Sequence, residues 1–552
     1  MFPRLITRYG LATHLALLAS LPFVLYPFLS SSTLSQVIFC LSGLAFLWLL
    51  TEPSMRAGEH LSIARRRVLS SLVRDIAFWF FLCALAVAFI RYLNSDVALA
   101  YVQDEWTIRE PSLPGLPAST GSAGLLPLAV LTGLSVTVLG IRHGIGLTGR
   151  ISFGISASFI MGIGGLAMVV CACVQVPSFM GAAKAHLLEG PFWSPFWGPG
   201  FGAWLICALA FGAQAEARKW GASRVPFCLA VAGNASGLLF FSPPPVSSVF
   251  LIVAVLVAIF CLAYLGRAGS MGASARSFVF MLLGFATPLF FMSALLPDEI
   301  EFDNCVRKVG TITEKVKEPV QNIYAVKAGG FLAIDKEQSA AYRTLSPMLS
   351  DIAKSVWKKH PWYGAGTGTF RLHAPFIATK EELQSFQQHK DDWRTLLISQ
   401  QMKDASKRAR EKGRDAVSEF DWTAVRPYNR NPVCAFNSYW TLLAERGLLG
   451  VALVVLGLGV LVFSYVARLV QSVLYLRTQD DADVFVFACP PIVWVTPFAV
   501  ALLLVLALYE PILEIAPMLL VCAVPLAIAA ASFPKKPTPR PLAVQPLEKE
   551  SH

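Results

Sequence analysis

Long apolar runs recur along nearly the whole chain and are separated by short polar segments. An α-helix rises about 1.5 Å per residue, so about 18 apolar residues are needed to cross roughly 30 Å of hydrocarbon. Such runs predict about twelve transmembrane helices, at 11–29, 34–50, 73–93, 122–141, 151–174, 200–216, 225–241, 245–266, 277–296, 440–467, 485–508 and 511–533. The first run could be a signal peptide, but LPFVLYPFLSSS offers no small-x-small cleavage site, so we expect a helix there too.

Basic residues collect in alternate loops between the predicted helices. They are Arg56 with Arg65, Arg66 and Arg67; Arg142 and Arg150; Arg218, Lys219 and Arg224; Arg267 and Arg276; Arg468 and Arg477; and Lys535, Lys536 and Arg540. The intervening loops are acidic at 94–121, aromatic and proline-rich at 175–199, and a short turn at 242–244 that leads into the triple proline 243–245. Because basic loops are retained in the cytoplasm, this alternation predicts that both termini are cytoplasmic.

One long polar segment, roughly 297–438, separates the ninth and tenth predicted helices, and the orientation places it outside the cytoplasm. Its stretch KDASKRAREKGRD is typical of a solvated helix face. The alternative is a surface that attracts an anionic substrate. We therefore expect an all-α polytopic membrane protein with a mainly helical external segment. Its parts are membrane helices at 1–296, the external segment at 297–438, membrane helices at 439–533 and a cytoplasmic tail at 534–552.

Composition supports the membrane class. Hydrophobic residues make up 55% of the 552 residues, charged residues only 15%, and the mean hydropathy is +0.58, far from the average of soluble proteins. The net charge of +11 would suggest nucleic acid as the partner of a soluble protein. Here much of that charge anchors loops at the membrane, so no nucleic-acid partner is expected.

Most of the eleven cysteines lie within apolar runs, where cysteine serves as a small packing residue. Cys305 and Cys434 differ, because they bracket the external segment at its two ends. In an oxidising exterior a disulfide between them would stabilise the fold by on the order of 4 kcal/mol on the chain-entropy account. Two free thiols at the membrane edge are the alternative.

The external segment contains the passage WKKHPWYGAGTGTF, in which Gly364, Gly366 and Gly368 alternate with other residues. The spacing is not that of a G-x-G-x-x-G nucleotide loop, and no strand pattern precedes it. A backbone turn fits better, one that needs positive φ or a close approach to another surface. The tenth predicted helix then begins with a polar collar that includes Asn437 and Glu445.

In the order of these parts the chain resembles the superfamily of O-antigen ligases and O-antigen polymerases, which are bacterial membrane glycosyltransferases. Members have many helices, a large late periplasmic segment and a histidine-proline passage with alternating glycines, matched here by His360, Pro361, Trp362, Tyr363, Gly364, Gly366, Gly368 and Phe370. Their next helix begins with a motif matched by Asn437, Tyr439, Leu443, Glu445, Gly447 and Gly450. The acidic, proline-bearing turn YEPILEIAP also looks similar, and the likeness is specific over 357–450 and architectural elsewhere.

The resemblance implies transfer or polymerisation of a glycan, carried on a lipid pyrophosphate such as undecaprenyl pyrophosphate, onto an acceptor hydroxyl at the periplasmic face of the inner membrane. Arginines would stabilise the charge that grows on the leaving pyrophosphate, and a base would accept the hydroxyl proton. No metal or other cofactor is expected, since no Asp-x-Asp motif or histidine cluster with metal-ligand spacing occurs in the external segment. The implied partners are membrane lipid, the lipid-linked donor, a glycan or lipid acceptor, and polysaccharide-assembly proteins.

The residues expected to carry this chemistry lie on both sides of the external segment's end. As catalytic residues we expect His373, Glu445 and Tyr439, and as substrate-binding residues Arg426, Arg430, Arg371, Asn437, Gly364, Gly366 and Gly368. Each assignment has a structural alternative. The arginines could anchor lipid headgroups, His373 could be a solvated loop residue, and Glu445 could form a salt bridge at the helix end.

The chain also departs from the family pattern. Phe436 stands where members carry the histidine thought to serve the acceptor, and Pro243 stands where a Ser-Arg-Gly passage usually places an arginine. The usual asparagine-rich passage is reduced to FWGPGFGAW. An active glycosyltransferase and a catalytically silent relative that binds lipid-linked glycan or an assembly partner therefore both stay open. A twelve-helix transporter is less favoured, because no two similar six-helix halves are detectable.

Overall fold

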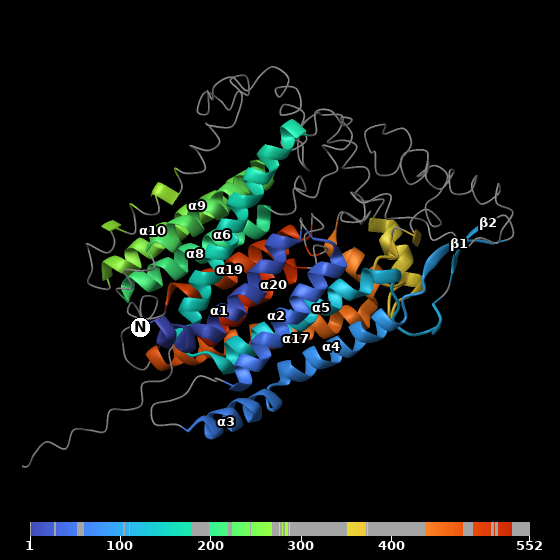
Figure 1. Cartoon of the computed structure of the whole chain (residues 1–552), viewed down its shortest axis with the longest axis horizontal. Coiled ribbons are helices and arrows are strands. Elements are labelled where there is room, and N and C mark those ends of the chain that lie inside the picture. Colours follow the sequence, from blue (N-terminus) through green and yellow to red (C-terminus); the bar gives the residue numbers. More distant parts are fainter. Residues whose placement is uncertain are drawn as a thin grey trace, which may run out of the picture.

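The computed structural model of the chain describes residues 2–26, 29–51, 60–102, 105–109, 111–178, 198–218, 224–242, 244–267, 350–370, 372–373, 437–477, 490–508 and 517–532, with a few positions within 275–286 and at 513. The α-helices are α1 (Phe2–Leu25), α2 (Ser31–Thr51), α3 (Leu61–Val73), α4 (Ile76–Leu93), α5 (Leu125–Leu139), α6 (Leu147–Ser178), α8 (Gly198–Ala217), α9 (Arg224–Phe241), α10 (Pro244–Arg267), α17 (Ser438–Arg477), α19 (Pro491–Leu506) and α20 (Met518–Ala531). A 3₁₀ turn η1 (Gly121–Gly124) precedes α5, and a π turn η2 (Gly140–Gly144) follows it. Most helices run side by side along one direction (Figure 1).

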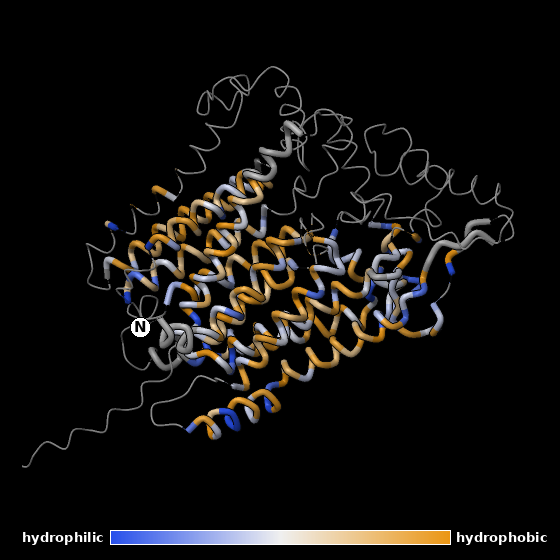
Figure 2. The backbone as a smooth tube through the Cα atoms, viewed as in Figure 1, coloured by the Kyte–Doolittle hydropathy of each residue, from blue (hydrophilic) through white to orange (hydrophobic). Residues whose placement is uncertain are grey.

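The apolar runs correspond to helices wherever the structure describes them. Within the described residues, seven helices are long and apolar enough to cross a membrane: Ser31–Thr51, Ile76–Leu93, Leu125–Gly144, Thr148–Val169, Gly198–Ala217, Val246–Gly266 and Ser438–Gln471. Four shorter apolar helices, Gly10–Leu25, Arg224–Leu239, Pro491–Leu506 and Met518–Ala531, match further predicted runs. Most of the run at 277–296 lies outside the described residues. Apolar residues cover these helices along their length, as expected for a multi-pass membrane protein (Figure 2).

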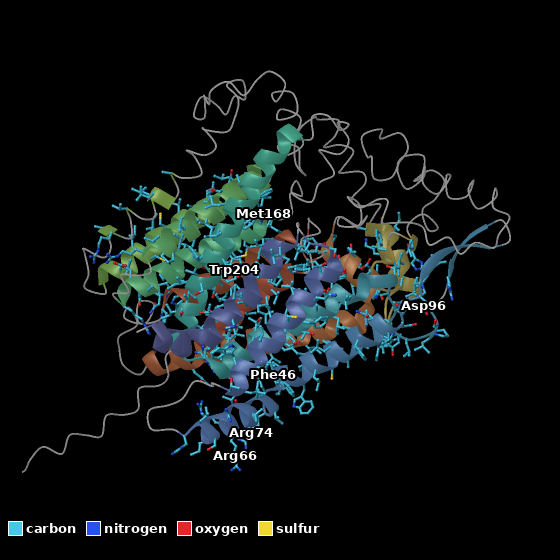
Figure 3. All side chains as sticks on the ribbon, viewed as in Figure 1. Phe46, Arg66, Arg74, Asp96, Met168 and Trp204 are labelled. Carbon is cyan, nitrogen blue, oxygen red and sulfur yellow. The ribbon has the colours of Figure 1, made fainter. Side chains whose placement is uncertain are left out.

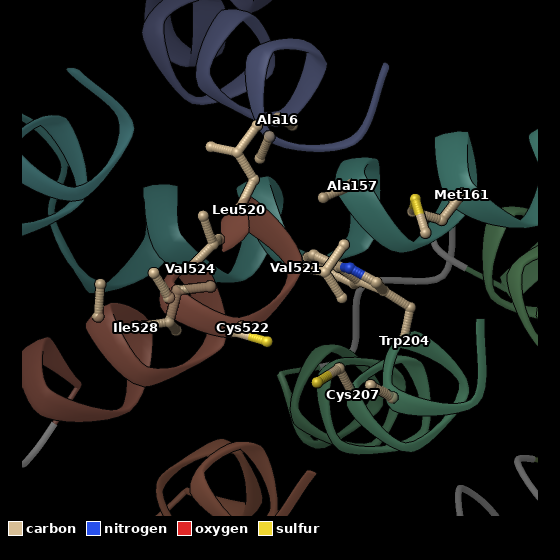
Figure 4. Packing of buried hydrophobic residues seen from close by; sticks show 14 of the residues in the cluster. Ala16, Ala157, Met161, Trp204, Cys207, Leu520, Val521, Cys522, Val524 and Ile528 are labelled. Carbon is tan, nitrogen blue, oxygen red and sulfur yellow. The ribbon is translucent and has the colours of Figure 1, made fainter. Parts of the chain in front are cut away.

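Helix α8 forms the centre of the packing. Its side chains are buried along almost the whole helix, against α6, α9, α10 and α19. The Trp204 ring of α8 lies beside Val521 of α20, with Met161 of α6 nearby (Figure 4). The outer helices instead turn large apolar side chains outward, such as Phe463 of α17, which is 74% exposed. Apolar side chains on both the inside and the outside of the bundle suit a protein surrounded by lipid.

Helices α6 and α9 cross in very close contact. A Cβ added to Gly233 would lie 1.9 Å from the carbonyl oxygen of Gly162, and one added to Gly165 would lie 2.4 Å from the oxygen of Gly233. At the same crossing the Asn234 amide donates hydrogen bonds to the carbonyl oxygens of Ser158 (3.1 Å) and Ala230 (2.7 Å). Small residues and interhelical hydrogen bonds are the usual means by which membrane helices associate.

Two elements occupy segments that the sequence assigned to loops. Helix α3 contains the basic run at 65–67, and it forms because apolar residues at 61, 64, 68 and 72 share one helical face. The strands β1 (Ala98–Val102) and β2 (Glu105–Arg109) pair antiparallel within the segment 94–121. The structure is mostly helical, as expected, and a short hairpin rich in β-branched and aromatic residues accompanies the helices.

A buried charge cluster joins α4 to η2. The Asp75 carboxylate accepts hydrogen bonds from Arg142 (2.8 and 3.2 Å) and from the N–H of Ala77 (3.0 Å), and its Oδ2 lies 2.7 Å from His143 Nε2. Burial raises the pKa of Asp75, but the hydrogen bond to His143 and the charge of Arg142 outweigh it and hold the pKa below its ordinary value. At the same end of the bundle Arg468 donates to the carbonyl oxygen of Ala530 (2.7 Å), in the last turn of α20.

The α6–α9 crossing predicts a large difference between two glycine substitutions. Gly233→Ala should destabilise the fold by about 1–3 kcal/mol, because the added methyl group has no room between two helix backbones. Gly43→Ala in α2 is the matched control, since no atom lies within 4 Å of a Cβ at that position. Thermal unfolding in detergent, followed with a thiol-reactive dye that reports exposure of the buried Cys207, Cys261 and Cys522, measures both. Equal melting temperatures for the two variants would contradict the close crossing.

Candidate functional site

Helix α17 is broken nine residues after its start, at Gly447, which has φ 62° and ψ −179°. This conformation is essentially restricted to glycine. The break interrupts the i to i−4 hydrogen bonds, so carbonyl groups before Gly447 and N–H groups after it need other partners. Within hydrocarbon or protein, such groups cannot be left unpaired without a large cost.

Residues 360–370, which we call the glycine turn, lie in this break and supply the missing partners. Carbonyl oxygens of Ala444 and Glu445 accept from the N–H groups of Ala365 (2.8 Å) and Gly366 (3.0 Å), and the N–H groups of Leu448 and Leu449 donate to the oxygens of Pro361 (2.9 Å) and Trp362 (3.0 Å). The two segments thus exchange backbone hydrogen bonds in both directions. We call the end of the bundle that carries residues 357–373 the turn end (Figure 1).

The glycines of the turn are required by space and by backbone conformation. A Cβ on Gly364 would lie 2.4 Å from the Glu445 carbonyl, and one on Gly447 would lie 2.3 Å from the Gly364 nitrogen. Gly364, Gly366 and Gly368 all have positive φ, at 73°, 118° and 77°. The turn interpretation of the sequence is therefore confirmed. A contact of these glycines with substrate stays a prediction.

Arg91, in the last turn of α4, completes the exchange of hydrogen bonds. Its Nη2 donates to the carbonyl oxygen of Arg446, directly before the break, and to that of Tyr363 at 3.4 Å. Arg91 is only 6% exposed, and Gly450 leaves room for it, since a Cβ there would lie 2.4 Å from Nη2. Sequence reasoning overlooked this residue, although an arginine near the end of an apolar run is a signal of function in membrane helices.

The opposite side of the glycine turn is bound by the segment that follows the β-hairpin. Thr367 donates through its N–H to the oxygen of Ala118 (3.0 Å) and accepts from the N–H of Thr120 (3.1 Å). Ser119 Oγ donates to the carbonyl oxygen of Arg91 at 2.9 Å, which links this segment back to α4. The turn is therefore held between α17 and the segment 117–120 by backbone hydrogen bonds on both sides.

Two of the predicted catalytic residues, Glu445 and His373, lie at or next to this turn. Glu445 Oε1 accepts from the N–H of Phe370 at 3.3 Å, and His373 lies three residues further along. The imidazole rings of His373 and His360 have centroids 5.7 Å apart. Burial, together with the positive charges of His360 and Lys359, lowers the pKa of the His373 imidazole to about 4. His373 is therefore neutral at pH 7 and able to accept a hydrogen bond.

The third predicted catalytic residue, Tyr439, lies with Asn437 at the start of α17. Asn437 caps the helix, because its Oδ1 accepts from the N–H groups of Tyr439 (3.0 Å) and Trp440 (3.2 Å). Its Nδ2 donates to the oxygen of Leu508 (3.0 Å), and the Tyr439 hydroxyl donates to the oxygen of Leu504 (2.9 Å). These hydrogen bonds join the start of α17 to the end of α19, so both side chains stabilise the packing of the two helices.

Basic and aromatic side chains border the same region. The Trp357 and Trp440 rings lie 6.1 Å apart, and Lys354 Nζ lies 5.2 Å from the Trp440 ring centroid. Lys358, Lys359 and Trp362 are exposed, Trp362 by 64%. Within the described ranges no three histidine, cysteine or acidic side chains are grouped to hold a metal ion.

Several predicted residues lie outside the described residues: Arg426, Arg430, Arg371, Cys305, Cys434, Phe436, Pro243 and the stretch at 403–415. Their roles, including the disulfide, stay predictions.

The break in α17 predicts that a side chain at either of the two facing glycines, Gly364 and Gly447, destabilises the docked turn. Gly364→Ala and Gly447→Ala should each destabilise the turn end by about 1–3 kcal/mol, because the Cβ would collide with backbone and both positions need positive φ. Gly459→Ala, in the same helix with no atom within 4 Å of its Cβ, is the control. Proteolysis of the turn in detergent should accelerate in the first two variants alone. Protection equal to that of the control would argue against the docked turn.

The low pKa of His373 predicts a pH-dependent stability. The unfolded chain binds a proton near the ordinary value of 6.5 and the folded chain only near 4, so this contribution to stability is present above pH 6.5 and lost as the pH falls to 4. His373→Gln should flatten the fall in melting temperature over that range. Lys359→Gln should weaken it, because removing a neighbouring positive charge raises the pKa of His373. A slope unchanged by His373→Gln would refute the assignment.

Comparison with protein-family models, with curated proteins and with solved structures finds no match to this chain.

Proposed function

We propose that the chain transfers or polymerises a lipid-pyrophosphate-linked glycan onto an acceptor hydroxyl, at a membrane face that we take to be external. The observation that carries the proposal is that the broken start of a membrane helix, which contains Glu445 and Arg446, docks against Arg91 and against the segment that carries the neutral His373. Ionisable groups at this depth are costly and are usually retained for function.

The reaction needs three kinds of group. The acceptor oxygen attacks the anomeric carbon, its proton passes to a base, and the sugar–phosphate bond breaks with its electron pair on the lipid pyrophosphate. Glu445 or His373 would accept the proton. Arg446, together with Arg426 and Arg430 from the preceding segment, would stabilise the charge that grows on the leaving group. Arg91 acts as a positioning residue, since its guanidinium binds the carbonyl oxygens of Arg446 and Tyr363.

A lipid-linked donor also suits the surface around the break. Leu448 and Leu449, directly after Gly447, are 45% and 36% exposed, and α17 continues from them with outward-facing apolar side chains. Trp362 stands exposed beside them, as aromatic residues do at membrane interfaces. A lipid tail could follow α17 while its pyrophosphate reaches Arg446. This arrangement supports a substrate that enters from the membrane.

A catalytically silent, glycan-binding role is the second candidate. It is favoured by Asn437 and Tyr439, whose side chains are engaged in capping α17 and in bonding to α19. It is also favoured by Phe436, which cannot accept a proton. In that case the site would bind lipid-linked glycan for a partner of an assembly machine.

Glycan transfer by the purified, reconstituted chain tests the proposal. Glu445→Gln, His373→Ala, Arg446→Gln, Arg426→Ala and Arg430→Ala are compared with the native chain, and we expect at least one carboxylate or imidazole variant and one arginine variant to lose about tenfold or more, roughly 1.4 kcal/mol of barrier. Asp351→Asn, at an exposed residue of the turn end, is the matched control. Melting temperatures separate lost chemistry from lost folding.

One result would favour the second candidate function, and another would contradict both. A native chain that binds lipid-linked glycan without transferring it, and that Phe436→His does not activate, would support the silent relative. A chain that neither binds nor transfers such a donor would contradict glycan handling altogether.

A further inference from the structure

Helix α3 lies on the outside of the bundle, at the end away from the glycine turn. It directly precedes the start of α4, whereas the last turn of α4 carries Arg91 into the turn end. Ala64, Val68 and Leu72 of α3 are buried against α4 and η2. Helix α3 lies at the edge of the bundle (Figure 1), and its side chains at 63, 65, 66 and 69 are exposed.

The outward side of α3 carries concentrated positive charge. Arg65, Arg66 and Arg74 are exposed, and the sequence from 61 to 74 contains no acidic residue. Figure 3 shows Arg66 and Arg74 at the outer edge of the molecule. The next residue, Asp75, cannot balance this charge, because it is buried and its carboxylate is paired with Arg142 and His143. The surface therefore attracts anions.

Large apolar side chains share this surface. Ile63, Leu69 and Val73 of α3 are 58%, 46% and 56% exposed, and Ile76 and Trp79 of α4 are 63% and 50% exposed. The Trp79 indole N–H donates to the carbonyl oxygen of Val73 at 2.9 Å, so the polar edge of the ring meets the end of α3 while the ring itself is open to the surroundings. Arginines beside exposed apolar side chains suit a surface that lies at the interface between water and the hydrocarbon of a membrane.

We propose that α3 lies in the headgroup layer of the membrane and binds the phosphate groups of anionic phospholipids through Arg65, Arg66 and Arg74. The occupant follows from position and charge. Helix α3 leads within three residues into the apolar helix α4, which sets it at the membrane surface, and guanidinium groups bind phosphate oxygens in a bidentate manner. Ile76 and Trp79 then contact the acyl chains just below. The inference does not depend on glycan transfer.

Lipid selectivity of the full chain tests this site. The protein is reconstituted into vesicles with spin-labelled phosphatidylglycerol or phosphatidylcholine, and the fraction of immobilised label gives the ratio of the two association constants. We expect a preference for phosphatidylglycerol of about threefold, lost in Arg65→Gln/Arg66→Gln/Arg74→Gln and weakened by high salt. The charge-conserving variant with lysine at the three positions should keep most of the preference.

The matched control removes the same charge elsewhere. Lys354→Gln/Lys358→Gln/Lys359→Gln neutralises three basic residues at the turn end and should leave the preference unchanged. An equal loss in this control, or no loss in the arginine variant, would overturn the proposal. Inorganic phosphate should lower the preference for phosphatidylglycerol no more than sodium chloride does at the same ionic strength. A larger effect of phosphate would overturn the proposal and indicate a soluble phosphate ligand. The single variants Arg66→Gln and Arg74→Gln, each expected to lower the preference, decide the matter if the triple variant does not fold.

Discussion

The exchange of backbone hydrogen bonds at Gly447 is the constraint on which the whole turn end depends. A membrane helix that breaks must find new partners for the carbonyl groups before the break and the N–H groups after it. Those partners come from the glycine turn and from Arg91. Three segments that are far apart in the chain, α4, the glycine turn and α17, therefore pack together. The pairing of their backbones positions the ionisable residues that they carry.

The same exchange explains how a buried cation is tolerated. Arg91 is removed from water at the end of α4, which is costly unless its donors are used and an opposite charge is near. The carbonyl oxygens of Arg446 and Tyr363 accept from its Nη2, and the attraction of Glu445 offsets part of the repulsion by the Arg446 charge. Glu445 in turn accepts from the N–H of Phe370. Hydrogen bonds to backbone groups thus hold α4, α17 and the glycine turn in one arrangement, which is the preorganisation that charge-stabilising sites require.

The sequence predicted those features that depend on local pattern. Apolar runs located the helices, and alternating glycines indicated a turn with positive φ, because both follow from a few neighbouring residues. Helix α3 was missed because its apolar face is short and its arginines resemble a loop. The role of Arg91 could not be predicted, since its partners lie 272 and 355 residues away in the chain. Likewise a catalytic Asn437 and a capping Asn437 have the same sequence signature, and only the bonds to α17 and α19 reveal the cap.

These contacts also narrow where chemistry could occur. Asn437 and Tyr439 belong to the packing of α17 on α19, and the turn glycines belong to the exchange of backbone hydrogen bonds. Among the described residues of this end, His373 and Glu445 are predicted catalytic residues that can accept a proton, and the docked turn holds their two segments together through the bond from the Phe370 N–H to Glu445. A carboxylate accepts several hydrogen bonds at once, so Glu445 can serve both the Phe370 N–H and a substrate hydroxyl. If the chain catalyses the proposed transfer, Glu445 and His373 are the candidates for its base among the described residues, and any change that undocks the turn would displace one from the other.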